Sequence, residues 1–117
     1  MVPYKKICSK LSIYLFMSTV VTRFEPCKKD ISRGAVYYRI YKRHNRRMEF
    51  FSRIRLLASS WDEATRRVKG DNPEACRFRV QIEADLELLN QIIAEDVSGL
   101  LTMGDMINIF KRRRTIV

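Results

Sequence analysis

Residues 36–48 read VYYRIYKRHNRRM and form the most distinctive stretch of the chain. The stretch holds three tyrosines and five cations but no acid. Side chains three or four positions apart share one face of an α-helix. At that spacing the apolar face comprises Tyr37, Tyr41, His44, Met48 and Phe51. The pattern predicts a long amphipathic helix that starts at Ser32, or at Asp30, as N-cap and runs to about Leu57.

Working outward, a short helix is predicted from the serines before Trp61 to about Lys69. A loop follows at residues 69–72, which read KGDN. Asn72 is then expected to cap a third helix with Pro73 at its first position, and Gly99 to end it. The apolar stripe of that helix would be Ala75, Phe78, Ile82, Leu86, Leu89, Ile93 and Val97.

Thr102 is expected to cap a last helix, with Asp105 in a capping-box position. Residues 111–114 supply four cations at the end of that helix, where its dipole is negative. No segment is assigned strand alternation. The sequence therefore predicts an all-α fold: a small antiparallel three- to four-helix bundle with an N-terminal extension.

The charge of the chain bears on its partners. Net charge is +10, and 46% of the 117 residues are apolar, which suits one globular domain. Residues 1–60 carry fourteen Lys/Arg against three acids, whereas residues 61–110 carry five against ten. Such a chain would bind nucleic acid, an anionic membrane or an acidic protein surface.

The sequence gives little support for an enzyme or for a metal-binding protein. Cys8, Cys27 and Cys76 are widely and irregularly spaced, so free thiols are expected rather than disulfides or a zinc site. There is one histidine, no glycine-rich phosphate loop and no evident nucleophile–base pair. The chain is predicted not to be an enzyme and to have no metal site.

The first 24 residues are basic and contain no acid; the first acid of the chain is Glu25. This composition suits a mitochondrial targeting segment, and a helix packed on a partner is the alternative. We therefore expect residues 1–30 to form a basic N-terminal extension and residues 31–117 to form the helical domain.

Two segments resemble the LYR-motif (complex 1 LYR) family of small mitochondrial helical proteins. Tyr37-Tyr38-Arg39 stands for the Leu-Tyr-Arg triplet, with Tyr41, Arg43, Arg46 and Met48 at the following motif positions. Gly99 and residues 107–113, which read INIFKRR, are similar to the C-terminal part of the LYR accessory subunit in the matrix arm of respiratory complex I.

The resemblance implies a non-catalytic accessory subunit, or an assembly factor, of mitochondrial complex I on the matrix side of the inner membrane. Its partners would be an acidic acyl carrier protein and other respiratory-chain subunits. It would have no cofactor of its own, and the acylated phosphopantetheine of the carrier protein would be the one group it could hold. The implied carrier-protein contacts are Tyr38, Arg39, Lys42, Arg43, Arg46 and Arg47. The implied lining of the acyl chain is Tyr37, Tyr41, Met48, Phe51, Leu86 and Leu89.

Two alternatives stay open. One is a basic RNA-contacting protein of the mitochondrial ribosome, which the net charge and the arginine-rich stretch would suit. The other is an LYR adaptor for iron–sulfur cluster delivery. Tyrosines at helical spacing are also ordinary core residues, and His44 on the apolar stripe is expected to be structural.

Overall fold

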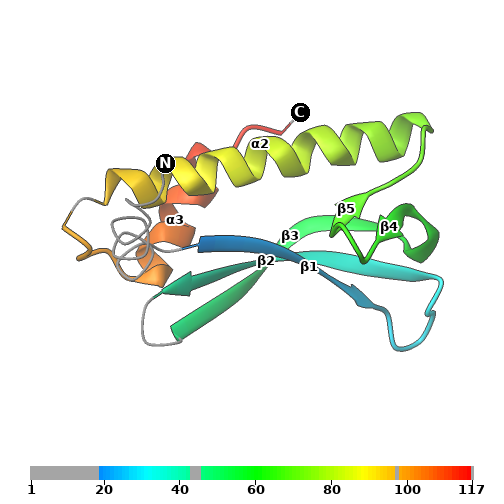
Figure 1. Ribbon diagram of the computed structural model, residues 1–117, viewed down its shortest axis with the longest axis horizontal. Helices are drawn as coiled ribbons and strands as arrows, with labels where there is room; N and C mark the ends of the chain where they lie inside the picture. The colour runs from blue at the N-terminus through cyan, green and yellow to red at the C-terminus, as the bar shows by residue number, and fades with distance from the viewer. Residues whose placement is uncertain (1–18, 43–45, 97, 117) are drawn as a thin grey trace, which may run out of the picture.

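In the computed structural model, which describes residues 19–42, 46–96 and 98–116, the chain combines antiparallel sheets with helices (Figure 1). Three strands form the main sheet: β1 (Thr19–Pro26), β2 (Arg33–Lys42) and β3 (Arg46–Leu57). A 3-10 turn (Ala58–Ser60) leads to a small hairpin of β4 (Trp61–Asp62) and β5 (Arg67–Val68). Two helices follow, α2 (Pro73–Glu95) and α3 (Met103–Arg113).

The three long strands form an antiparallel meander with β2 in the centre. In the turn before β2, the Asp30 carboxylate accepts hydrogen bonds from the backbone N–H (3.1 Å) and the hydroxyl (2.5 Å) of Ser32. Gly34 then lies opposite Pro26, where a β-carbon would collide with the Phe24 ring and the Glu25 carbonyl oxygen. Close packing of two strands therefore requires glycine at this position.

The all-α prediction is wrong, and the long helix predicted from Ser32 or Asp30 to Leu57 is two strands. Along β2, Val36, Tyr38 and Ile40 are fully buried while the residues between them are half-exposed. This is the period of two that a half-buried strand shows. Tyrosine and the β-branched Val and Ile also favour strands, because their side chains pack well on a pleated surface. The helical spacing of Tyr37, Tyr41, Met48 and Phe51 was coincidental.

The short helix predicted between Trp61 and Lys69 is also absent; these residues form the β4–β5 hairpin. Trp61 lies opposite Val68, and both side chains are buried. The Trp61 ring stacks on Phe24 at 5.7 Å between centroids, so the hairpin packs against β1. Long-range aromatic packing decided this segment, not the serines and acids that suggested a helix start.

Both C-terminal helices begin where the sequence predicted. The Asn72 side chain accepts a hydrogen bond from the N–H of Ala75 (2.8 Å), with Pro73 in the first turn of α2. Thr102 and Asp105 form the predicted capping box at the start of α3. Helix α2 ends at Glu95, and Gly99, expected to end it, has a φ of +72° in the connection to α3.

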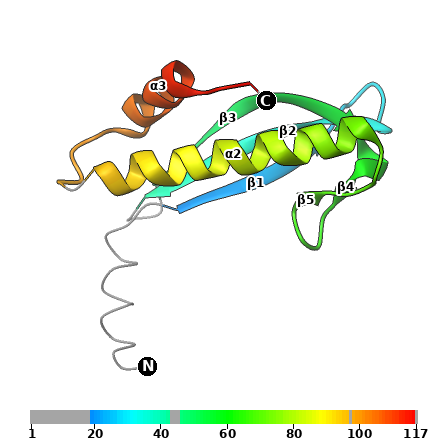
Figure 2. The same cartoon turned by 90° about the horizontal axis from the view of Figure 1, so that it is seen from above.

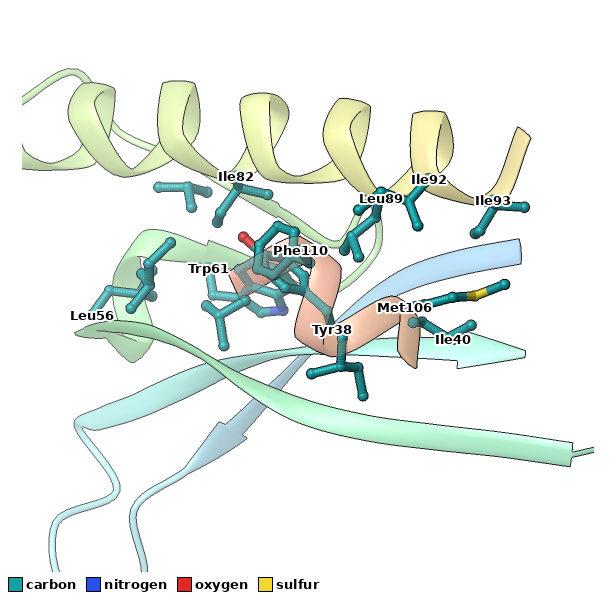
Figure 3. Close-up of a cluster of buried hydrophobic side chains, with 14 of the residues drawn as sticks. Tyr38, Ile40, Leu56, Trp61, Ile82, Leu89, Ile92, Ile93, Met106 and Phe110 are labelled. Atoms are coloured by element: carbon teal, nitrogen blue, oxygen red, sulfur yellow. The ribbon is translucent and has the colours of Figure 1, made fainter. Parts of the chain in front are cut away.

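The helices pack on one face of the main sheet, so the core lies between two layers (Figure 2). Helix α2 runs along the sheet, and α3 lies beside it. Figure 3 shows the side chains that fill the space between them. The buried core residues in this view are Tyr38, Ile40, Leu56, Trp61, Ile82, Leu89, Ile92, Ile93, Met106 and Phe110. Tyr38, Phe50 and Phe110 meet edge to face, with ring centroids 5.5–6.1 Å apart.

A buried polar group ties the two layers together. The Asp85 carboxylate is 1% exposed and accepts hydrogen bonds from the Tyr38 hydroxyl (2.6 Å) and the Gln81 amide (2.8 Å). Arg114, just after α3, donates to both of its oxygens, at 3.0 and 2.6 Å. Burial raises the pKa of Tyr38, and its hydrogen bond to Asp85 raises it further. One carboxylate thus links β2, α2 and the end of α3.

Candidate functional site

The face of the main sheet turned away from α2 and α3 is not covered by any described element (Figures 1 and 2). Strand alternation assigns side chains to this face, because those between the buried residues of β2 and β3 point the other way. We call it the open face. Its cationic and aromatic part comprises Arg23, Tyr37, Arg39, Tyr41, Arg47, Glu49, Phe51, Arg53 and Arg55.

Two arginines of the open face share one carboxylate. Glu49 on β3 accepts two hydrogen bonds from Arg23 on β1, both 2.6 Å long. It also accepts from Arg39 on β2, through Nε at 3.1 Å and Nη2 at 2.9 Å. These contacts, the bonds from Arg23 first, lower the pKa of Glu49 against the opposing effect of its partial burial. Arg23 also pairs with Glu25 on β1 (2.7 Å), so two arginines and two carboxylates form a network across all three strands.

Aromatic rings support the guanidinium groups. Arg23 lies over the Tyr37 ring at 5.1 Å from its centroid, and Arg55 lies over Phe51 at the same distance. The Tyr37 and Phe51 rings themselves contact at 5.7 Å. Such cation–π contacts hold the planes of the guanidinium groups while leaving their remaining N–H donors free for a ligand.

Tyr41 extends this arrangement toward the end of β2. Its hydroxyl accepts a hydrogen bond from Arg39 (3.1 Å), and Arg39 lies 5.9 Å from the centre of its ring. The hydrogen bond from Arg39 is the largest cause of a lowered Tyr41 pKa, and Arg47 acts in the same direction. The open face therefore brings together arginines, aromatic rings and the two carboxylates of Glu25 and Glu49.

The residues predicted to bind a carrier protein are separated by the fold. Tyr38 is in the core, and the Lys42 ammonium group donates to the carbonyl oxygen of Leu101 (2.6 Å) before α3. Arg39 is half-buried on the open face, and Arg46 and Arg47 are exposed at the start of β3. Arg43 lies outside the described residues.

The residues predicted to line an acyl chain do not surround a common cavity. Tyr37, Tyr41 and Phe51 are on the open face, while Leu89 is fully buried in the core on the other side. Met48 is 39% exposed near the start of β3. Leu86 lines a groove of about 480 Å³ between β1, the β4–β5 hairpin and α2, together with Val20, Thr22 and Ile82.

Sequence reasoning missed the contributions of β1 and β3 to the open face. Arg23 comes from the segment assigned to the N-terminal extension, and β1 pairs with β2 along its whole length. In residues 49–57, which read EFFSRIRLL, charged residues alternate with apolar ones over Arg53, Ile54, Arg55 and Leu56. That alternation was the signal available for Arg53 and Arg55.

The described ranges contain no group of three or more His, Cys, Asp or Glu side chains that could hold a metal ion. Within those ranges, no helix has the length and apolar character needed to cross a membrane. The side chains of the open face offer hydrogen-bond donors, positive charge and aromatic faces, which bind anions and planar groups.

The fold and the site together define a small α/β domain whose uncovered antiparallel sheet carries a basic and aromatic surface. Residues 28–98 match the family model of the Arm DNA-binding domain, and this segment is more than half of the chain. The chain belongs to that family. Comparisons with curated proteins and with solved structures gave no match.

The family overturns the resemblance to LYR proteins and the complex I role and partners inferred from it. The triplet Tyr37-Tyr38-Arg39 lies in a strand, whereas the LYR motif belongs to a helix. An accessory role in respiratory complex I, with an acyl carrier protein as partner, is contradicted. The ribosomal and iron–sulfur alternatives have no support either. The resemblance to LYR proteins rested on assigning a helical period to a stretch that has the period of a strand. Its positive charge could not correct this, because a basic stretch suits acidic proteins and nucleic acids alike.

Proposed function

We propose that this chain is a non-catalytic DNA-binding domain, of the kind that integrases contain, and that it binds duplex DNA through the open face. The observation that carries the proposal is an array of five arginines and three aromatic rings, in which Arg23, Arg39 and Arg55 lie over rings and the acids are Glu25 and Glu49. This array lies on a sheet of an Arm DNA-binding domain, on the side left uncovered by the described elements.

The dimensions of the sheet suit the major groove. Three strands spaced about 4.8 Å apart span about 10 Å, and the major groove of B-DNA is about 12 Å wide. Several DNA-binding proteins place strands in a groove in this way. Guanidinium groups on the outer strands can then contact the phosphates that border the groove, while those in the centre reach base edges.

The distribution of charge favours one orientation on DNA. The exposed surface of α2, on the far side of the domain, carries Glu74, Glu83 and Glu87. These acids offset the exposed cations of the helix side, whereas arginines outnumber acids on the open face, so a polyanion is attracted more strongly to the sheet side.

The salt dependence of binding tests the proposal. Five arginines less the carboxylates of Glu25 and Glu49 leave about three positive charges, so the slope of log K against log salt should be about −2.7. We expect Arg39→Gln, Arg47→Gln and Arg55→Gln together to weaken binding and to reduce the slope by about 2.7. Fluorescence anisotropy with a short labelled duplex of mixed sequence measures both quantities.

A matched control removes the same charge from the helix side. Arg77, Lys111 and Arg112 are exposed on α2 and α3. Their triple change to glutamine should leave the affinity and the slope close to those of the unmodified chain. Equal losses in both triple variants would mean that DNA binds by net charge alone, and the open face would not be the site.

A further inference from the structure

An irregularity in β3 adds a residue to the open face. Val36 pairs with Ile54, but the next residue of β2, Tyr37, pairs with Phe51. Ser52 and Arg53 therefore have no partner on β2, and they form a bulge of two residues in the centre of the sheet. Bulges redirect side chains and are common beside functional sites.

The bulge is held by a buried hydroxyl. Ser52 is fully buried, and its Oγ donates a hydrogen bond to the Val36 carbonyl oxygen (2.7 Å). The Ser52 Oγ also accepts a hydrogen bond from the N–H of Ile54 (3.0 Å). Because Ser52 satisfies the backbone groups that the bulge separates, the irregularity is a stable part of the fold.

Arg53 occupies the outer position of the bulge in a conformation that glycine would favour. Its φ is +68°, in the left-handed region that costs free energy for a residue with a β-carbon. Ser52 and Ile54 on either side are buried, so the exposed Arg53 side chain points to the open face. Backbone strain of this kind persists at binding sites, where the side chain has a role.

The side chain of Arg53 differs from those of its neighbours because it contacts neither a carboxylate nor an aromatic ring. Arg23, Arg39 and Arg55 each contact a carboxylate or an aromatic ring. Among the described residues, Arg53 makes no hydrogen bond, ion pair or ring contact. The bulge fixes the backbone of Arg53 between the supported arginines, and the five N–H donors of its side chain remain free for a ligand.

We propose that Arg53 is the specificity-determining residue of the open face and that it reads the edge of a guanine in the major groove. This inference rests on the proposed DNA-binding function. A guanidinium group donates two parallel hydrogen bonds to O6 and N7 of guanine, and this pairing distinguishes guanine from the other bases. The supported arginines hold the phosphates and set the register, and the unsupported one reads sequence.

The first experiment selects preferred sequences from a random duplex DNA library with the full chain. We expect one guanine position to be enriched, and its replacement by 7-deazaguanine, which lacks N7, to weaken binding about tenfold. Arg53→Gly should lose this preference and become insensitive to 7-deazaguanine while keeping weaker, sequence-independent binding. Arg53→Lys, which keeps the charge but not the planar donor pair, should lose most of the preference.

Folding does not confound this test, because glycine adopts φ +68° without strain and the variant should melt no lower than the unmodified chain. Arg66 supplies a matched control. It is the other non-glycine residue with positive φ among the described residues, at +56°, in the β4–β5 connection that Thr22 contacts on the helix side of β1. Arg66→Gly removes the same charge and relieves similar strain, and it should leave the guanine preference intact.

The outcomes separate the two proposals. A library from which no sequence is enriched, or an Arg53→Gly variant that keeps the preference, overturns the role of Arg53 while DNA binding stands. Loss of the preference in Arg66→Gly as well also overturns it. A chain that binds no duplex at all overturns the proposed function itself.

Discussion

The buried carboxylate of Asp85 allows a quantitative test of what holds the sheet to the helices. In Asp85→Asn, one carboxylate oxygen becomes an amide nitrogen, which cannot accept hydrogen bonds. Arg114 then loses its only counter-charge among the described residues and one of its two acceptors, and either Tyr38 or Gln81 loses an acceptor as well. The side chain of Arg114 is 10% exposed, so water replaces the lost contacts poorly.

The size of the effect follows from this burial. Removing one partner of a buried ion pair costs about 3–5 kcal/mol, because the remaining charge stays desolvated. A domain of this length is stable by about 5–15 kcal/mol, so the loss is a large part of the total. Each kcal/mol shifts the melting temperature by about 3–6 °C at this size. We therefore expect Asp85→Asn to melt roughly 10–25 °C below the unmodified chain.

Urea unfolding followed by the fluorescence of Trp61, which is 6% exposed, measures this loss. The control is Glu95→Gln, since Glu95 pairs with Arg113 at the α2–α3 interface but both side chains are about half-exposed. That change should cost no more than about 1 kcal/mol. Asp85→Asn combined with Arg114→Gln should recover part of the stability, because it removes the unpaired charge. If Asp85→Asn lost no more stability than Glu95→Gln, the reasoning from burial would be refuted.

Three further changes test the sheet. Gly34→Ala should destabilise the domain by about 1–3 kcal/mol or more, because the added β-carbon meets a backbone oxygen. The control, Gly104→Ala in α3, should stabilise it by up to about 1 kcal/mol. Thermal melts compare the two variants, and equal effects would contradict the clash. Ser52→Ala should cost about 1–3 kcal/mol, since the Val36 carbonyl and the Ile54 N–H lose their partner; urea titration checks it, and an unchanged midpoint would show that the hydroxyl does not hold the bulge. The pKa of Glu49 is lowered in the folded state, so its contribution to folding stability is present above its ordinary pKa of 4.5 and is lost as pH falls below that value. Thermal melts from neutral pH to about pH 3 should therefore show a smaller fall in melting temperature for Glu49→Gln than for the unmodified chain. Superimposable pH profiles would exclude this contribution.

The elements that could be predicted are those that local contacts decide. The start of α2 depends on Asn72, Pro73 and Ala75, which lie within four residues of each other. The start of α3 depends equally on Thr102 and Asp105. Caps of this kind satisfy free backbone groups whatever the rest of the chain does, so sequence reasoning recovers them.

The main sheet could not be recovered in the same way, because its pairings join residues far apart in the chain. Residues 36–48 fit a helical period through Tyr37 and Tyr41 and a strand period through Val36, Tyr38 and Ile40. Local spacing does not choose between these two. Pairing with β1 and β3 on either side chose the strand, since a central strand gains hydrogen bonds and packing from both neighbours.

The candidate site was recovered only in part for the same reason. Arg39 and Arg47 drew attention by charge density in the sequence, and both lie on the open face. Arg23, Glu49 and Arg55 join them only through strand pairing. The sequence also did not identify the partner, because positive charge alone attracts any polyanion. The aromatic rings could be assigned to the site only once the structure placed arginines over them.

The two faces of the sheet are fixed by one register, which couples stability to binding. A slip of β2 by one residue would bring Arg39 into the core and expose Val36 and Ile40, at a prohibitive cost in buried charge and lost apolar contact. A bulge of one residue in β3 would do the same to every residue on one side of it, placing Arg55 in the core and Ile54 on the open face. A bulge of two residues keeps the alternation. It therefore adds Arg53 to the open face while Ile54 stays buried, so a further donor is present there without disturbing the core.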